Sequence, residues 1–404
     1  MPSAPVPVGP PAARGRARDL GLRIGLLPSG PTASIVDVPG VRVGHATVWR
    51  DEPPPPLGRG VARTGVTAIL PAEPASLFHA RVPAGGAVLN GAGEAIGLTG
   101  IREWGLLESP ILLTSTLAIG RVYDATVELL TELDPAIGRD DVLIPCVAEC
   151  DDARLNDART VQVAAADVRA AVEGARGAEA GASPVGAVGA GTGMICCQLK
   201  GGIGSASRIV PLGDASWTVG VLVLANFGRL ERLTVDGVRV GETLAVEGWP
   251  AAGLPRGTHL PGRAAARGED QGSCIVVVAT DAPLLGAQLE RLARRAGLGL
   301  ARVGSFAGHG SGEIFLACST GLRVPRGGPA LVEQRHVADE ALDPLFAAVV
   351  EATEEAVLDS LVAADTVTGR DGATVPALPL ERTVELLRAA GRPATLATGV
   401  AALP

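Results

Sequence analysis

A serine that directly follows a long irregular segment is the first candidate for chemistry in this sequence. Residues 249–272 are rich in Gly and Pro without helical or strand periodicity, and a run of apolar residues then begins at Ser273. A cut between Gly272 and Ser273 would give Ser273 a nucleophilic hydroxyl and a free α-amine. That amine titrates near pH 8, so it can act as the base without a histidine. The junction predicts a self-made N-terminal nucleophile, although an ordinary loop-to-strand boundary has the same residues.

A second polar group lies in the segment GHGSGEIFL, residues 308–316. Ser311 and Glu313 are two residues apart at the start of a predicted strand, so their side chains project from one face, roughly 7 Å apart. The carboxylate could therefore orient the hydroxyl. His309 would complete a Ser-His-Glu triad, but a single histidine in a glycine-flanked loop is more often structural. We expect the Ser311–Glu313 pair to be the functional unit.

Several residue types are scarce, and their few copies gather in glycine-marked segments. The only lysine is Lys200, the only tyrosine is Tyr123, and the asparagines are Asn90, Asn156 and Asn226. Almost every basic residue is Arg, which suggests a GC-rich genome, so the retained copies are better functional candidates than elsewhere. An asparagine in a turn can also be there for its left-handed backbone conformation.

Two familiar kinds of ligand site are not supported by the motifs. The six cysteines have no Cys-x-x-Cys spacing and no companion histidine, so we expect buried thiols rather than zinc ligands: Cys146, Cys150, Cys196, Cys197, Cys274 and Cys318. The Gly-rich segment GAVGAGTGMICC runs into a predicted strand instead of a helix, and there is no Gly-Lys-Ser/Thr, which argues against nucleotide binding. We expect no metal and no cofactor.

Composition sets the class of protein. The 404 residues are 47% hydrophobic and 19% charged, which is typical of a globular chain. A net charge of −8 and the lack of a basic cluster leave a phosphate backbone nothing to bind, so we expect no nucleic-acid partner. The longest apolar runs are too short to span a membrane, and the N-terminus does not resemble a signal peptide. We expect a cytoplasmic protein without a membrane partner.

Strand and helix patterns alternate along the chain. SIVDV and VRVGHATV at residues 34–38 and 41–48 predict two strands, and the continuous apolar run VGVLVLA predicts a strand covered on both faces. Amphipathic helices are predicted to follow, with a long one at residues 339–364. We predict a flexible tail over residues 1–16 and a single domain over 17–404. Its predicted architecture is α+β, with two sheets sandwiched between helical layers (αββα).

Ordered motifs along nearly the whole chain are SIVDVPGVRVGHATV, RTGVTAI, LNGAGE, PILLTST, VAECDDARLND, GAGTGMICCQLKGGIGSASR, VGVLVLANFG, GSCIVVVATDAP, GSGEIFLACST and VVEATEEAVLDSL. Together they resemble the L-aminopeptidase/D-Ala-esterase-amidase and β-peptidyl aminopeptidase family of self-cleaving, N-terminal-nucleophile serine hydrolases. The resemblance implies an aminopeptidase or amidase that releases small N-terminal L-, D- or β-residues from short peptides, amides or esters. It also implies a homotetramer of α/β heterodimers.

The resemblance further implies where the chain is cut and which residue attacks. Cleavage between Gly272 and Ser273 would leave an α-chain with a folded part over 17–272 and a β-chain over 273–404, with 249–272 as the processing loop. Ser273 would be the nucleophile.

Supporting roles are implied for four matching positions. Ser311 and Glu313 would form a polar relay behind the nucleophile, Asn226 would donate to the oxyanion, and Glu149 would hold the free amino group of the substrate. These assignments suit the chemistry, because a carboxylate binds an ammonium by charge-assisted hydrogen bonds and an amide can stabilise an oxyanion.

One departure from the family pattern keeps alternatives open. Members of the family have a tyrosine shortly after the glutamate, where this chain has Asp151, Asp152 and Arg154. A non-catalytic relative that binds small amino compounds is one alternative. A self-cleaving acyltransferase of related fold is another, although its threonine nucleophile has no counterpart at Ser273.

Overall fold

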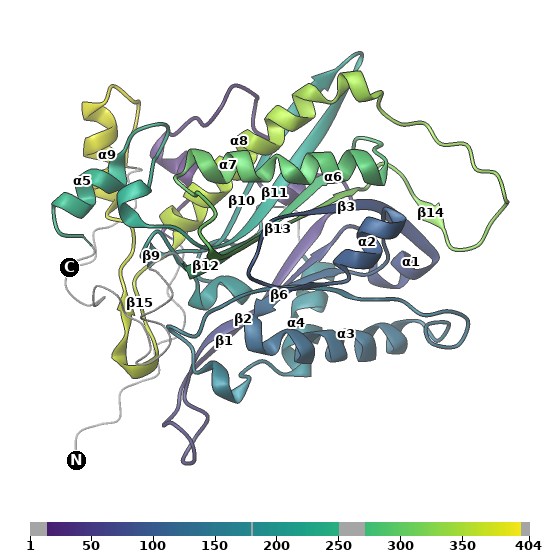
Figure 1. Cartoon of the computed structure of the whole chain (residues 1–404), viewed down its shortest axis with the longest axis horizontal. Coiled ribbons are helices and arrows are strands. Elements are labelled where there is room, and N and C mark those ends of the chain that lie inside the picture. The colour runs from purple at the N-terminus through teal and green to yellow at the C-terminus, as the bar shows by residue number, and fades with distance from the viewer. Residues whose placement is uncertain (1–13, 179–180, 250–270, 397–404) are drawn as a thin grey trace.

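A computed structural model of the chain describes residues 14–178, 181–249 and 271–396. Two β-sheets lie face to face, and helices cover the outer face of each sheet (Figure 1). The layer order is therefore helix, sheet, sheet, helix, and the predicted αββα sandwich is confirmed.

The first sheet has five strands in the order β1-β2-β6-β7-β4. Only β6 and β7 run parallel; the other neighbours are antiparallel. The bounds are β1 Arg42–Asp51, β2 Val61–Leu70, β6 Ile111–Ser115, β7 Cys146–Cys150 and β4 Ala95–Ile96.

The second sheet has seven strands, with the path β10-β11-β12-β13-β3-β14 and with β5 paired to β3. Its parallel pair, β12 and β13, lies at the centre between antiparallel neighbours. The bounds are β10 Gly202–Leu212, β11 Ala215–Asn226, β12 Gln271–Thr280, β13 Gly310–Ser319, β3 Ala80–Gly91, β14 Val324–Pro325 and β5 Leu106–Leu107.

Helices α3 (Ile119–Leu133) and α4 (Ala165–Arg176) cover the first sheet, and α6 (Gly286–Arg294), α7 (Ala296–Arg302) and α8 (Asp343–Ala363) cover the second (Figure 1). The shorter described elements are α1 Pro74–His79, α2 Leu98–Trp104, α5 Val240–Val246, α9 Leu380–Ala389 and the two hairpins β8–β9 (Ile195–Cys196, Leu199–Lys200) and β15–β16 (Val367–Thr368, Thr374–Val375). Within the described part of the chain, no helix is both long and apolar enough to cross a membrane.

Side-chain alternation along the strands builds three apolar layers. Ile275 and Leu224 belong to the cluster between the two sheets, whereas Cys274 and Val276 belong to the cluster between the second sheet and its helices. A third cluster fills the space between the first sheet and α3 and α4. Successive residues of β12 therefore point into different layers, which later decides where the side chain of Ser273 lies.

Helix α8 carries an ionic cluster into the second of these layers. Arg208 of β10 has no exposed surface, and its guanidinium pairs with Glu351 at 3.2 Å and with Glu355 at 2.7 Å. One turn further along α8, Asp359 pairs with Arg16 at 2.8 Å. We call these five residues the α8 ionic cluster.

The two strands and the tail predicted for the N-terminal part can be compared with the structure. The predicted strand at 34–38 is wrong: Ile35–Asp37 forms a 3-10 turn, because the carboxylate of Asp37 accepts hydrogen bonds from the Thr32 and Ser34 N–H groups. The strand predicted at 41–48 is confirmed as β1. Of the segment 1–16, residues 1–13 lie outside the described residues, and Arg16 packs on α8 as part of the ionic cluster.

Candidate active site

Ser273 lies near the start of β12, at the centre of the second sheet. The register places it opposite Asn226 on antiparallel β11 and opposite Gly312 on parallel β13. The residue is 4% exposed, and its Oγ makes no hydrogen bond with the described residues. Most of the segment expected to be the processing loop, residues 250–270, lies outside the described residues.

The thiol of Cys150, at the end of β7, lies beside this hydroxyl. Burial raises the pKa of the Cys150 thiol well above its ordinary value, and the nearby Ser273 offsets only part of that rise. The thiol is therefore protonated at neutral pH and acts as an apolar neighbour. All six cysteines are free and buried, as the sequence predicts.

Ser311 and Glu313 are joined as their spacing predicts, since Ser311 Oγ donates a hydrogen bond to Glu313 Oε1. Both side chains are buried, and Glu313 Oε2 has no hydrogen-bond partner within the described residues. Burial raises the pKa of Glu313, against the opposing effect of the Ser311 hydroxyl. His309 is exposed on the preceding loop.

The register also shows that this pair faces away from the hydroxyl of Ser273. Ser311 is paired with Gly272 and Glu313 with Cys274, whereas Ser273 itself is paired with Gly312. Residues paired across neighbouring strands share a face of the sheet. The Ser311–Glu313 pair therefore lies on the face of Cys274, toward the helices, and Ser273 Oγ points between the sheets.

Asn226, the last residue of β11, shares the face of Ser273. Its Oδ1 accepts a hydrogen bond from the Ile195 N–H at 2.9 Å, and its Nδ2 donates to the carbonyl oxygen of Asp151 at 2.9 Å. The Ile195 N–H must donate, so the orientation of the amide is fixed. Within the described residues the second Nδ2 hydrogen has no acceptor, so it can donate to a ligand.

Glu149 of β7 approaches the site from the first sheet. Its Oε1 accepts a hydrogen bond from the Glu94 N–H at 2.8 Å, and its Oε2 accepts one from the Thr116 hydroxyl. The backbone of Gly93 connects it to the second sheet: a Cβ built there would lie 3.2 Å from Glu149 Oε1 and 3.8 Å from the Cα of Gly312.

The surroundings of Glu149 are acidic and largely dry. Burial raises its pKa, the two hydrogen bonds oppose the rise, and the carboxylates of Asp151 and Glu94 add to it. The causes of this shift include no cation among the described residues. A buried carboxylate in such a place gains most from a cation that arrives with a ligand.

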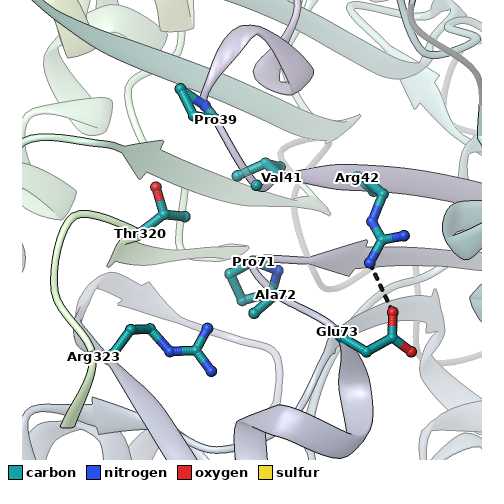
Figure 2. A pocket seen from close by; sticks show the side chains of 9 residues that line it. Pro39, Val41, Arg42, Pro71, Ala72, Glu73, Thr320 and Arg323 are labelled. Atoms are coloured by element: carbon teal, nitrogen blue, oxygen red, sulfur yellow. Dashed lines mark hydrogen bonds and ion pairs between the residues drawn. The ribbon is translucent and has the colours of Figure 1, made fainter.

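One cavity lies away from these residues. It has a volume of about 570 Å³ and lies at the far end of β13, between Pro39–Arg42, Pro71–Glu73, Thr320 and Arg323. Figure 2 shows Arg42 paired with Glu73 and Arg323 on another side of the cavity. No residue singled out for chemistry lines it. Ser311 and Glu313 instead line a small pocket with Phe227 and the 305–308 loop.

Sequence reasoning named five of the polar side chains at this site and gave no role to others. Glu94, Thr116 and Cys150 lie within the quoted motifs LNGAGE, PILLTST and VAECDDARLND, but their roles depend on contacts between separate segments, which the motifs do not reveal. Lys200 stood out by scarcity alone, and no role followed from that. Tyr123 packs in α3 against the outer layer of the first sheet, away from the site.

Comparison with known proteins gives the class of fold and then the family. The chain matches the solved β-aminopeptidase of a Burkholderia species (42% identity, TM-score 0.81) and the L-aminopeptidase D-Ala-esterase/amidase of Ochrobactrum anthropi (39%, TM-score 0.82), covering 93% of this chain and 99% of each. The latter is described as a prototype serine aminopeptidase and a variant of the Ntn-hydrolase fold. This protein therefore has an Ntn-hydrolase-type fold.

The family follows from two further matches. Residues 33–375 match peptidase family S58. The β-peptidyl aminopeptidase BapA of Sphingosinicella xenopeptidilytica is 42% identical over 378 residues, which cover 93% of this chain and 91% of that protein. The chain belongs to peptidase family S58, the family of serine-type aminopeptidases that the sequence motifs predicted.

Proposed function

We propose that the protein cleaves itself between Gly272 and Ser273 and then removes small N-terminal residues from short peptides, amides or esters through an acyl-enzyme on Ser273. The relatives named above are called a β-aminopeptidase, a β-peptidyl aminopeptidase and an L-aminopeptidase D-Ala-esterase/amidase. The observation that carries the proposal is the place of Ser273: buried at the start of β12, opposite Asn226, with an unpaired hydroxyl.

The self-cleavage needs only the chain itself and water. Ser273 Oγ attacks the carbonyl carbon of Gly272, the Gly272–Ser273 C–N bond breaks, and the nitrogen takes up the hydroxyl proton. Water then hydrolyses the ester, which leaves a carboxylate on Gly272 and a free amine and hydroxyl on Ser273. Close packing supports a glycine here, because a Cβ on residue 272 would lie 2.5 Å from the carbonyl oxygen of Asn226.

In turnover the new α-amine of Ser273 acts as the base. It accepts the proton of Oγ as Oγ attacks the substrate carbonyl, and it returns that proton to the leaving amine or alcohol. Water then attacks the acyl-enzyme by the same route. The Ser311–Glu313 pair faces away from Oγ. We therefore propose that it interacts with the backbone nitrogen of Ser273, which becomes the α-amine and lies between the two faces of the sheet.

Two further groups complete the mechanism. The unused hydrogen of Asn226 Nδ2 donates to the oxyanion, a contribution that is typically on the order of 3 kcal/mol. Glu149 binds the ammonium of the substrate, which would be the cation that its acidic surroundings lack. Glu94 and Asp151 add negative potential at the same place, so the proposed substrates carry a free amino group.

The two fragments would stay together after the cut. Strand β12 of the proposed β-chain is hydrogen-bonded between β11 of the α-chain and β13 of its own chain, and β13 pairs in turn with β3 of the α-chain. We also propose the homotetramer of such heterodimers. It is supported by the long loop between β14 and α8, which projects from the body of the molecule (Figure 1). On this loop the apolar residues Leu331 and Val332 are 90% and 59% exposed.

The first test is the state of the purified protein, by denaturing gel, intact mass and N-terminal sequencing. We expect two fragments, one of them beginning Ser-Cys-Ile-Val, and turnover of a small aminoacyl anilide. Ser273→Ala should remain a single chain without turnover. Ser216→Ala, at an exposed serine at the other end of β11, is the matched control and should be cleaved like the wild type.

The alternatives give different results in the same experiment. A single, folded 40.7 kDa chain that binds amines without turnover would favour the non-catalytic relative. Cleaved protein that passes an acyl group to an added amine faster than to water would favour the acyltransferase. Light scattering of the native protein tests the tetramer, and a monomeric heterodimer would contradict it.

A further inference from the structure

Lys200, the only lysine of the chain, is buried without a carboxylate partner. It ends β9, has no exposed surface, and makes no ion pair within the described residues. Its Nζ donates instead to three backbone carbonyl oxygens, those of Gly191 at 3.1 Å, Met194 at 2.7 Å and Gly201 at 2.7 Å. A buried, unpaired ammonium is costly, so its position calls for a reason beyond packing.

One of these carbonyls belongs to the peptide group that holds Asn226. The Met194 carbonyl oxygen accepts from Lys200 Nζ, and the Ile195 N–H of the same peptide group donates to Asn226 Oδ1 at 2.9 Å. The amide nitrogen of Asn226 in turn donates to the Asp151 carbonyl oxygen and has one hydrogen left, on the face of Ser273. A continuous chain of hydrogen bonds thus runs from the ammonium to the amide opposite the nucleophile.

We propose that Lys200 is a positioning residue for acyl transfer, which acts through the Met194–Ile195 peptide group on the oxyanion donor Asn226. This inference rests on the proposed function. In its protonated form Lys200 draws electron density from the Met194 carbonyl, which makes the Ile195 N–H a stronger donor and, through Oδ1, the remaining Nδ2 hydrogen a stronger donor. The three carbonyl bonds also fix the segment 191–201, so Asn226 needs no reorganisation when the oxyanion forms.

The charged groups around Lys200 do not replace this role. Burial lowers the pKa of Lys200 to about 7, and two titratable groups, Cys196 on β8 and Asp152 after β7, oppose that shift. Asp152 is engaged elsewhere, since its Oδ1 accepts hydrogen bonds from Ser115 Oγ at 2.7 Å and Asn156 Nδ2 at 2.9 Å. Among the described residues, only Lys200, when protonated, places a formal positive charge on the peptide group that holds Asn226.

The test is a double-mutant cycle of Lys200→Met and Asn226→Ala, measured as kcat and KM for an aminoacyl anilide and as the rate constant of self-cleavage. We expect Lys200→Met to lower kcat and the cleavage rate by roughly tenfold to a hundredfold, less than a lost oxyanion donor, with KM changed by less than about threefold. In the Asn226→Ala background the same substitution should lower either rate by less than about threefold, because the residue it acts through is gone.

A purely structural role predicts a different pattern. Equal losses in both backgrounds, or a loss confined to KM, would overturn the proposal. Arg16→Met is the control for stability, because Arg16 also donates to three backbone carbonyls, those of Thr32, Ala33 and Ser205, yet lies in the α8 ionic cluster. It should lower the melting temperature and leave kcat unchanged.

A second variant tests the proposal if Lys200→Met does not fold. Ile195→Pro removes the Ile195 N–H, which lies between Lys200 and Asn226 in the chain of hydrogen bonds. Met194 already has the extended backbone (φ −80°, ψ 146°) that a following proline requires. Ile195→Pro should give the same non-additive loss with Asn226→Ala, and an additive loss would overturn the proposal.

A wild-type protein that neither cleaves itself nor turns over substrate would overturn the proposed function and this inference together. An active wild type with additive variants would overturn this inference alone.

Discussion

Two regions of this molecule bury carboxylates differently: one supplies them with cations, and the other does not. In the α8 ionic cluster, burial raises the pKa of Glu355 and Asp359, and the guanidinium groups of Arg208 and Arg16 lower it again. At the candidate site, burial raises the pKa of Glu149 and Glu313, and only hydroxyl and N–H groups oppose the rise.

The difference separates a structural use of buried charge from a functional one. Each carboxylate of the α8 ionic cluster has a guanidinium partner within the chain. The cluster therefore stabilises α8 and orients it against β10 and the N-terminal segment. The carboxylates of the candidate site have no cationic partner among the causes of their pKa shifts in the described structure. This costs stability, but it leaves Glu149 able to bind the ammonium of the proposed substrate. Substitutions in the two regions should therefore have opposite signatures, on stability in one case and on kinetics in the other.

The largest effect is expected in the ionic cluster. Arg208→Met should lower the free energy of unfolding by about 3–5 kcal/mol, because it leaves Glu351 and Glu355 buried without their cation. Urea unfolding monitored by circular dichroism measures this loss. KM and kcat of the folded fraction should match those of the wild type, and a changed KM would show that the two regions are coupled.

An intermediate effect is expected at Glu149. Glu149→Gln should raise KM roughly tenfold to a hundredfold, as expected for a lost charge-assisted hydrogen bond of about 1.5–3 kcal/mol, without loss of stability. Steady-state kinetics and a thermal melt of the same sample measure both quantities. A melting temperature that falls as far as that of Arg208→Met would place Glu149 with the structural carboxylates instead.

The raised pKa of Glu149 also gives these measurements a pH dependence. The folded state holds the proton more tightly than the unfolded chain, so stability falls as the pH rises from the ordinary glutamate pKa through the raised one. Binding of an ammonium needs the ionised form, so kcat/KM of the wild type should rise over the same window. Both trends should be absent in Glu149→Gln.

The smallest effect is expected at Asp151, whose side chain is exposed. Asp151→Asn keeps the backbone carbonyl that holds Asn226 and removes one negative charge near Glu149. KM should rise by about twofold to threefold at low salt and by less at high salt, because exposed charges are screened. A salt-independent change would mean that Asp151 acts by direct contact with the substrate.

The sequence predicted the layers, the family and the local spacings, for reasons that are themselves local. Alternation places Ser311 and Glu313 on one face of a strand whatever the rest of the chain does, and their hydrogen bond confirms it. The strand predicted at 34–38 failed because the Asp37 carboxylate competes for the backbone N–H donors, an effect that hydrophobic periodicity does not reveal.

The tertiary structure decided which of these groups meet. The register of β11, β12 and β13 placed Asn226 opposite Ser273 and the Ser311–Glu313 pair on the other face of the sheet. The backbone of Gly93 lies beside both Glu149 and Gly312, so Glu149 lies near the start of β13. Helix α8 has carboxylates at i, i+4 and i+8, and the arginines that pair with them, Arg208 and Arg16, come from distant segments of the chain. Sequence fixes the period of an element, whereas pairing between distant strands depends on the packing of the whole chain.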